Sequence, residues 1–146
     1  MQPQTLGIII GGLIPGVLFG FSNVIVKYAT SKGIALPLYL IVTGLAVVLV
    51  GVVLLFIVPE RHVSVQGGIA GFVGGAIWAS GMSLIVFALE RYSASISVLT
   101  PLFNLNTLVA VVLGLWIFSE WKTVSISQLF LGAVCIAVGG TLVARA

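Results

Sequence analysis

The stretch LAVVLVGVVLLFIV, residues 45–58, contains no polar side chain and decides the fold class. A membrane-spanning β-strand alternates apolar and polar residues over about ten positions, and this stretch does not alternate. A helix that crosses a bilayer needs roughly 20 consecutive, mostly apolar residues. Because the apolar run begins at residue 36, the sequence predicts a transmembrane helix over residues 36–58.

Four further runs have the same character. With residues 36–58 they predict an all-α membrane protein, a bundle of five transmembrane helices forming a single domain over residues 1–146. The additional helices are expected at residues 6–26, 67–89, 95–118 and 127–144. The segments between the helices are short and carry charge, so neighbouring helices must run antiparallel. The amino end lacks the basic stretch of a signal peptide, and we therefore expect the first helix to be retained.

Composition and charge exclude a water-soluble domain. Apolar residues make up 60% of the chain and charged residues only 6%, against roughly 25% charged residues in ordinary globular proteins. The basic residues stand singly near the ends of the predicted helices, where membrane proteins keep their charges, whereas a nucleic-acid-binding protein clusters them on one face. They are Lys27, Lys32, Arg61, Arg91, Lys122 and Arg145. We expect a multi-pass protein of the cell (inner or plasma) membrane that contacts lipid and no nucleic acid.

No pattern typical of an enzyme stands out. His62 is the only histidine and lies in a predicted loop, and Cys135 is the only cysteine and lies in an apolar run. The glycine-rich segment GGIAGFVGG at residues 67–75 reads as a helix face of small residues and not as a phosphate-binding loop. We expect no catalytic site, no metal site and no cofactor.

Small residues recur at helical spacing on three predicted helices. Such faces let helix backbones approach closely in a membrane, and we expect close helix contacts there. The series are Gly12, Gly16 and Gly20; Gly67, Gly71, Gly75 and Ala79; and Gly132 with Gly139. Pro15 and Pro101 are each expected to bend a helix. Pro101 lies near the start of its helix, where the cost is small, so Pro15 is the better hinge candidate.

Polar side chains within the apolar runs point to a binding cavity. Ser97, Thr100, Asn104 and Thr107 follow one face of the fourth predicted helix. Because an amide that faces lipid is costly, this stripe is expected to face protein or water. We predict that a small-molecule substrate cavity is lined by Asn104 and Thr107, with Asn23, Tyr39, Thr43 and Trp78 from neighbouring helices. The alternative for each residue is a hydrogen bond between helices.

Four landmarks in this order resemble a known family. They are FGFSNVIVKYA at residues 19–29, VFALERYSASISVLTPLFNL at 86–105, LGLWIFSEW at 113–121 and QLFLGAVCIAVGGTLV at 128–143. Together with Pro37 at the start of the second helix, they are similar to the EamA-type repeat of the drug/metabolite transporter superfamily. The resemblance covers essentially the whole chain. It differs at Thr43 and Gly44, where many members carry an arginine, and at Glu90, where a basic residue is common.

The resemblance implies half of a ten-helix fold in which two such repeats are inverted. It implies export or exchange of small metabolites by alternating access, and a single repeat implies a homodimer, with an antiparallel one favoured. One alternative is an exporter like the four-helix small multidrug-resistance proteins, against which stand the fifth helix and the lack of an acid in the first. A second is a non-transporting membrane subunit packed against a partner.

Overall fold

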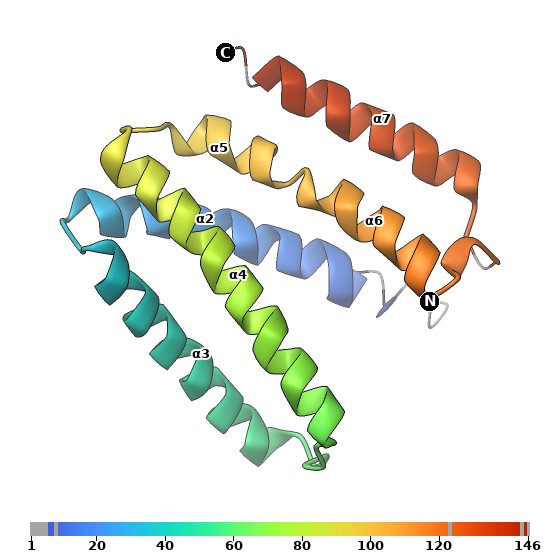
Figure 1. Ribbon diagram of the computed structural model, residues 1–146, viewed down its shortest axis with the longest axis horizontal. Coiled ribbons are helices and arrows are strands. Elements are labelled where there is room, and N and C mark those ends of the chain that lie inside the picture. Colours follow the sequence, from blue (N-terminus) through green and yellow to red (C-terminus); the bar gives the residue numbers. More distant parts are fainter. Residues whose placement is uncertain (1–5, 8, 123, 144, 146) are drawn as a thin grey trace. The chain divides into compact units, whose positions relative to one another are not determined.

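The structure, a computed structural model, describes residues 6, 7, 9–122, 124–143 and 145 (Figure 1). Within these residues the regular structure is helical, and five segments are long and apolar enough to cross a membrane. They are Ile9–Ser31, Leu36–Ile57, Val65–Arg91, Ile96–Ile117 and Ile126–Val143. The predicted all-helical chain with five helices of membrane-spanning length is therefore confirmed.

The chain divides into two compact units, Met1–Ser93 and Ala94–Ala146, which we call the amino-terminal unit and the carboxyl-terminal unit. The amino-terminal unit contains the π-helix η1 (Ile9–Leu13) and helices α2 (Ile14–Ser31), α3 (Leu36–Ile57) and α4 (Val65–Arg91). The carboxyl-terminal unit contains α5 (Ile96–Phe103), α6 (Asn106–Ile117), the 3-10 turn η2 (Glu120–Lys122) and α7 (Ile126–Val143). In the first unit α4 packs on α2 and α3, and in the second α7 packs on α5.

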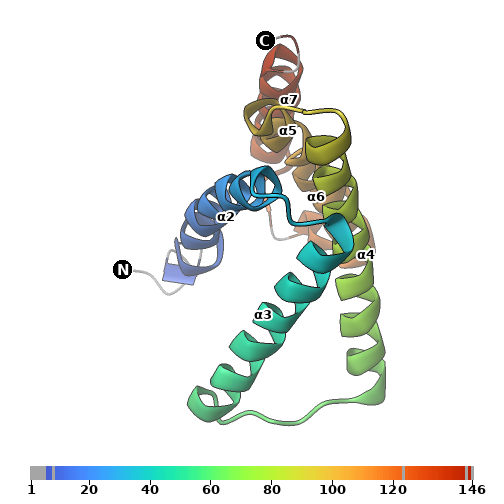
Figure 2. The same cartoon turned by 90° about the vertical axis from the view of Figure 1, so that its left-hand side faces the viewer.

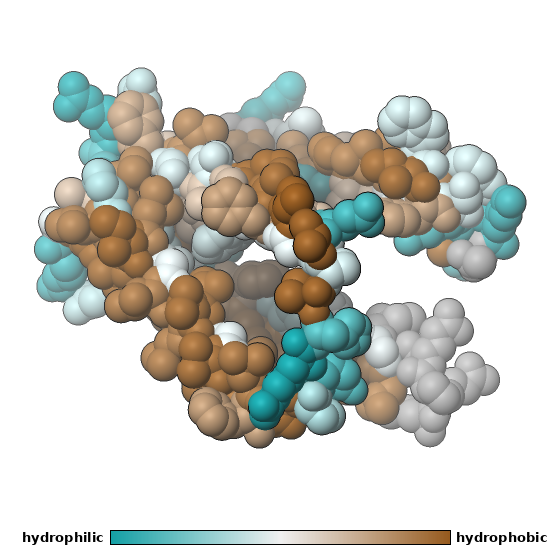
Figure 3. Space-filling model, turned by 60° about the horizontal axis from the view of Figure 1, so that its bottom comes forward, coloured by the Kyte–Doolittle hydropathy of each residue, from teal (hydrophilic) through white to brown (hydrophobic). Residues whose placement is uncertain are grey.

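The core of the amino-terminal unit lies at one end of its helices. Val26 of α2 and Val86 and Leu89 of α4 are its buried apolar side chains. Helices α3 and α4 are close at that end and separate toward residues 58–64 (Figure 2). Most other apolar side chains are exposed, and they dominate the surface in Figure 3. Such a surface suits a lipid environment, where apolar side chains have no water to avoid.

The first span is distorted at its beginning and extends beyond its predicted end. The π-helical turn η1 comes directly before Pro15, which lies in the first turn of α2. A proline ring crowds the carbonyl four residues earlier, here at Gly11 within η1, and π-turns relieve such conflicts. The structure thus places a backbone distortion where the sequence predicts a bend.

Lys27 lies inside α2, whereas the predicted helix over residues 6–26 ends just before it. The helix ends at Ser31, two residues before Gly33, whose φ of 83° is the left-handed conformation that glycine adopts without strain. The Gly33 amide donates to the Thr30 carbonyl at 3.0 Å, and the Ile34 amide to the Ala29 carbonyl at 3.5 Å. This glycine-closed pattern satisfies the last carbonyls of the helix, so glycine and not the lysine charge sets its end.

Candidate functional site

The fourth span is broken near its middle. The span predicted over residues 95–118 is present as Ile96–Ile117, and the bend expected at Pro101 takes the form of a two-residue turn, because α5 ends at Phe103 and α6 begins at Asn106. Pro101 lies inside α5 and has no amide hydrogen to give the carbonyl four residues earlier. Just after it, the hydrogen-bond pattern tightens. The Leu105 amide donates to the Leu102 carbonyl at 3.1 Å and the Thr107 amide to the Asn104 carbonyl at 3.0 Å.

This break makes Pro101 a stronger hinge candidate than the sequence indicates. Pro15 lies in the first turn of a helix that runs unbroken to Ser31, whereas α5 ends two residues after Pro101. In membranes, irregular backbone at this depth is tolerated where it is buried in protein or lines a water-filled cavity.

Asn104 occupies the break itself. Its side chain is exposed, and within the part of the chain that the structure describes its carboxamide has no hydrogen-bond partner. Its backbone carbonyl accepts two hydrogen bonds, from the Thr107 amide and from the Thr107 hydroxyl at 2.7 Å. An exposed carboxamide at mid-span is costly against lipid tails and favourable against water, a substrate or another polar chain.

The Thr107 hydroxyl forms a hydrogen bond to the backbone that could not be predicted from the sequence. Its hydroxyl bridges the break by donating to the Asn104 carbonyl, and the Asn106 side-chain oxygen lies 3.4 Å away. The hydroxyl proton is therefore engaged, although its oxygen can still accept a bond from a ligand. The predicted polar stripe is divided: Ser97 and Thr100 lie on α5, and Thr107 lies on α6.

The other predicted cavity residues belong to the amino-terminal unit. Asn23 lies on α2, Tyr39 and Thr43 lie on α3, and Trp78 lies on α4. The first three are half-buried, and Trp78 is exposed. Among the described residues, no hydrogen bond or ring contact joins any of these four side chains to another. Their part in a common cavity stays a prediction.

The predicted glycine faces do not form close contacts among the described residues. A Cβ built at Gly71 or Gly75 meets no heavy atom within 4 Å, and the same holds for the glycine series of the first span (Gly12, Gly16 and Gly20) and for Gly132 and Gly139. Gly67 has a different role, since its amide donates to the Ser64 hydroxyl at 3.0 Å, which caps α4. A contact of the Gly71 face with a second protomer stays a prediction.

The close backbone approach in the carboxyl-terminal unit occurs at Gly140, which sequence reasoning missed. A Cβ at this buried glycine of α7 would lie 3.4 Å from Leu105 Cδ2 and 3.8 Å from the Pro101 carbonyl oxygen. The signal in the sequence is the pair Gly139–Gly140, but two adjacent residues point about 100° apart on a helix. The helical period alone selects neither of them.

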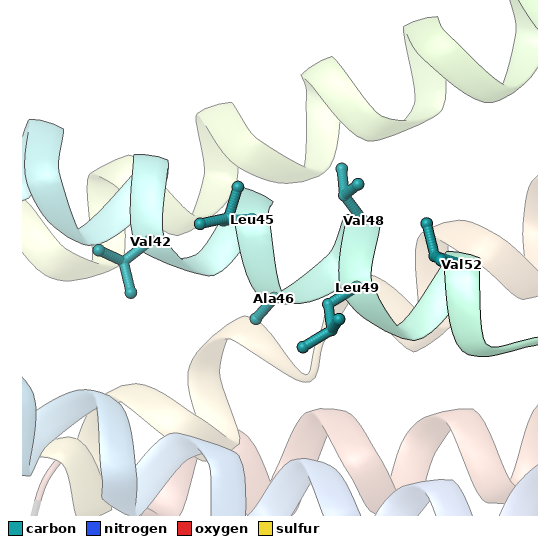
Figure 4. Close-up of a pocket in the computed structure, with 6 residues that line it drawn as sticks. All are labelled: Val42, Leu45, Ala46, Val48, Leu49 and Val52. Atoms are coloured by element: carbon teal, nitrogen blue, oxygen red, sulfur yellow. The ribbon is translucent and has the colours of Figure 1, made fainter.

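A shallow hollow of about 470 Å³ lies on α3, as Figure 4 shows. Its lining consists of Val42, Leu45, Ala46, Val48, Leu49 and Val52, all from one helix and all apolar. It contains none of the predicted cavity residues. A ligand site needs a few placed polar groups to orient its ligand, so we assign no site here.

Apart from Lys27, which lies within α2, the charged side chains lie near or beyond the ends of the spans. The Lys32 ammonium lies 5.4 Å from the Tyr28 ring centroid, and the Arg61 guanidinium reaches back to donate to the Leu55 carbonyl of α3 at 3.0 Å. Glu120 follows α6, and its carboxylate lies 3.0 Å from where a Cβ would stand at Gly114. Among the described residues, no group of three potential metal ligands gathers.

A comparison with protein-family models, curated proteins and solved structures found no significant match.

Proposed function

We propose that this chain is a secondary transporter of small metabolites that works by alternating access. In this proposal a second copy supplies the other half of a ten-helix assembly, as the resemblance to the EamA-type repeat implies. The substrate binds near the middle of the membrane, at Asn104 and the residues around it.

The observation that carries the proposal is the broken fourth span with an exposed carboxamide at the break. Transporters commonly bind their substrates near the bilayer midplane, at helices interrupted at that depth. Here the interruption at Asn104 and Leu105 falls close to the middle of Ile96–Ile117. The Asn104 side chain offers both a donor and an acceptor, which suits a small polar substrate.

The first experiment measures whether water reaches the break. Cys135, which is exposed, is first replaced by alanine to give a cysteine-free background. Asn104→Cys and Thr107→Cys are then treated with a membrane-impermeant, water-soluble thiol reagent in liposomes. We expect both to react, and a panel of small metabolites that includes the substrate should slow the reaction at Asn104→Cys.

Matched controls make the result decisive. Val112→Cys on α6 tests a side chain expected to face lipid, and Val63→Cys tests a loop; both side chains are exposed. If the loop cysteine reacts while positions 104 and 107 stay as inert as position 112, the cavity assignment fails. A non-transporting subunit would give reactive cysteines only after its partner had been stripped away, and no uptake by the purified protein in liposomes.

A further inference from the structure

We propose that Gly140 is a positioning residue that clamps α5 to α7, and that the break at Asn104 and Leu105 is a joint about which α6 moves. This inference deepens the proposed transport function, because the joint carries the carboxamide that we place at the substrate. Its test does not depend on transport.

Two independent observations meet at the joint. The backbone of the fourth span is interrupted at Asn104 and Leu105, after Pro101. On the facing helix, Gly140 of α7 faces both Leu105 and the Pro101 carbonyl, and a Cβ built there would lie at ordinary contact distance from each, which leaves no room for a longer side chain. A side chain that extends beyond Cβ at position 140 would press first on the Leu105 side chain and then on the Pro101 backbone, which cannot move aside as a side chain can.

The packing of the carboxyl-terminal unit indicates that α5 is held more firmly against α7 than α6 is. Helix α7 packs mainly on α5, while its contacts with α6 are few. Within the carboxyl-terminal unit, α6 contacts chiefly η2, the turn that follows it. Proline-associated breaks absorb changes in backbone angle, so motion is expected to concentrate at the joint. The clamp at Gly140 then fixes one side of Asn104 while the other side follows α6.

Distances between spin labels test this arrangement. In the Cys135→Ala background, one pair joins α5 to α7 (Ser97 and Leu131) and a second joins α6 to α7 (Val112 and Leu142), all at exposed positions. Labelled protein is diluted with unlabelled protein in nanodiscs, so that distances between protomers do not contribute. We expect one narrow distance for the α5–α7 pair and a broad or two-peaked distribution for the α6–α7 pair.

The adjacent glycine supplies the matched control. Gly140→Leu should broaden the α5–α7 distance, whereas Gly139→Leu, which points into open space, should leave it unchanged. Shortening the facing side chain, in Gly140→Leu with Leu105→Ala, should restore much of the narrow distribution. Gly140→Ala should behave as wild type, since its Cβ would lie at ordinary contact distance from Leu105.

Equal effects of leucine at positions 139 and 140 would overturn the clamp. An α6–α7 distribution as narrow as that of α5–α7 in the wild-type sequence would overturn the joint, and this comparison needs no variant at position 140. If the distances behave as expected while purified protein moves no substrate, the proposed function falls and the joint stands. If transport is found with a rigid α6, the joint alone falls.

Discussion

Ser64 shows how one hydroxyl sets the start of a membrane helix. It accepts a hydrogen bond from the Gly67 amide, which would otherwise lack a partner in the first turn of α4. We expect Ser64→Ala to lower the free energy of unfolding in detergent by about 1 kcal/mol. Ser80→Ala is the control. The Ser80 hydroxyl donates to the Ala76 carbonyl, which already accepts a helical hydrogen bond, so no backbone group loses its partner in this variant. Equal losses in both variants would contradict the cap.

Substitutions of Thr107 can distinguish the effect of its hydrogen bond across the break from the effect of its side-chain shape. Thr107→Val keeps the branched shape but removes the hydroxyl that donates to the Asn104 carbonyl. We expect faster hydrogen exchange at residues 104–107, since a lost hydrogen bond weakens the structure by on the order of 1 kcal/mol. Thr107→Ser keeps the donor and should exchange as wild type does. Slow exchange in Thr107→Val would show that the backbone bonds alone hold the break.

The break in the fourth span depends on Pro101 at the scale of the element. Pro101→Ala restores an amide that can bond the Ser97 carbonyl, and it removes the ring that crowds the preceding turn. We expect α5 and α6 to join into a straighter helix, seen as slower hydrogen exchange at residues 102–107. Uptake in liposomes should fall several-fold, because the joint stiffens. Pro15→Ala serves as the comparison, since its proline lies in the first turn of α2, and it should leave exchange at residues 102–107 unchanged.

The helices could be predicted from the sequence, because each needs about 20 apolar residues and little else. The ends of the helices could not be predicted, because local hydrogen bonds set them. Helix α2 continues beyond Lys27 to the turn closed by Gly33. Helix α4 begins directly after its cap Ser64, two residues before the predicted start at position 67. A bend at Pro101 was expected, but an interruption of the helix at Asn104 and Leu105 was not, since a proline near the start of a helix costs little. The fourth span is interrupted where the amides of Leu105 and Thr107 bond to the carbonyl three residues earlier instead of four.

The cavity at Asn104 and Thr107 stays a prediction. The sequence selected Asn104 because an amide in an apolar run needs a polar neighbour, and the structure leaves that amide exposed at the break. It could not show that the Thr107 hydroxyl is engaged by the Asn104 carbonyl, because that bond depends on the break. It also could not choose Gly140 over Gly139, since the choice depends on the angle at which α7 meets α5.

At the scale of the whole molecule, the sparse core bears on assembly. The buried apolar side chains among the described residues are Val26, Val86 and Leu89, so most of each span is left to lipid or to other protein. In the transporter that we propose, the five spans form one half of a ten-helix assembly, and alternating access requires two inverted halves. We propose that the second half is another copy of this chain, inserted in the opposite direction.

The distribution of charge supports insertion in both directions. If all five spans cross the bilayer, Lys32, Arg91 and Arg145 reach one side and Arg61 and Lys122 the other. Lys27 joins the first group, but it is half-buried within α2 and counts less toward orientation. The positive-inside rule then gives only a weak preference for a cytoplasmic carboxyl end.

Reporter fusions at the carboxyl terminus test this balance. We expect signal both from a reporter active only in the cytoplasm and from one active only outside it. Replacing Arg61 and Lys122 with glutamine should leave only the cytoplasmic signal, because the remaining lysine and arginine residues all lie on the side of the carboxyl end. Replacing Lys32 and Arg91 instead should shift the signal to the outside. A wild-type signal from one side alone would exclude dual insertion and favour a parallel dimer or a partner of opposite topology. A monomer in nanodiscs would exclude the dimer. It would also exclude the proposed alternating access, which requires a second five-helix half that moves against the first.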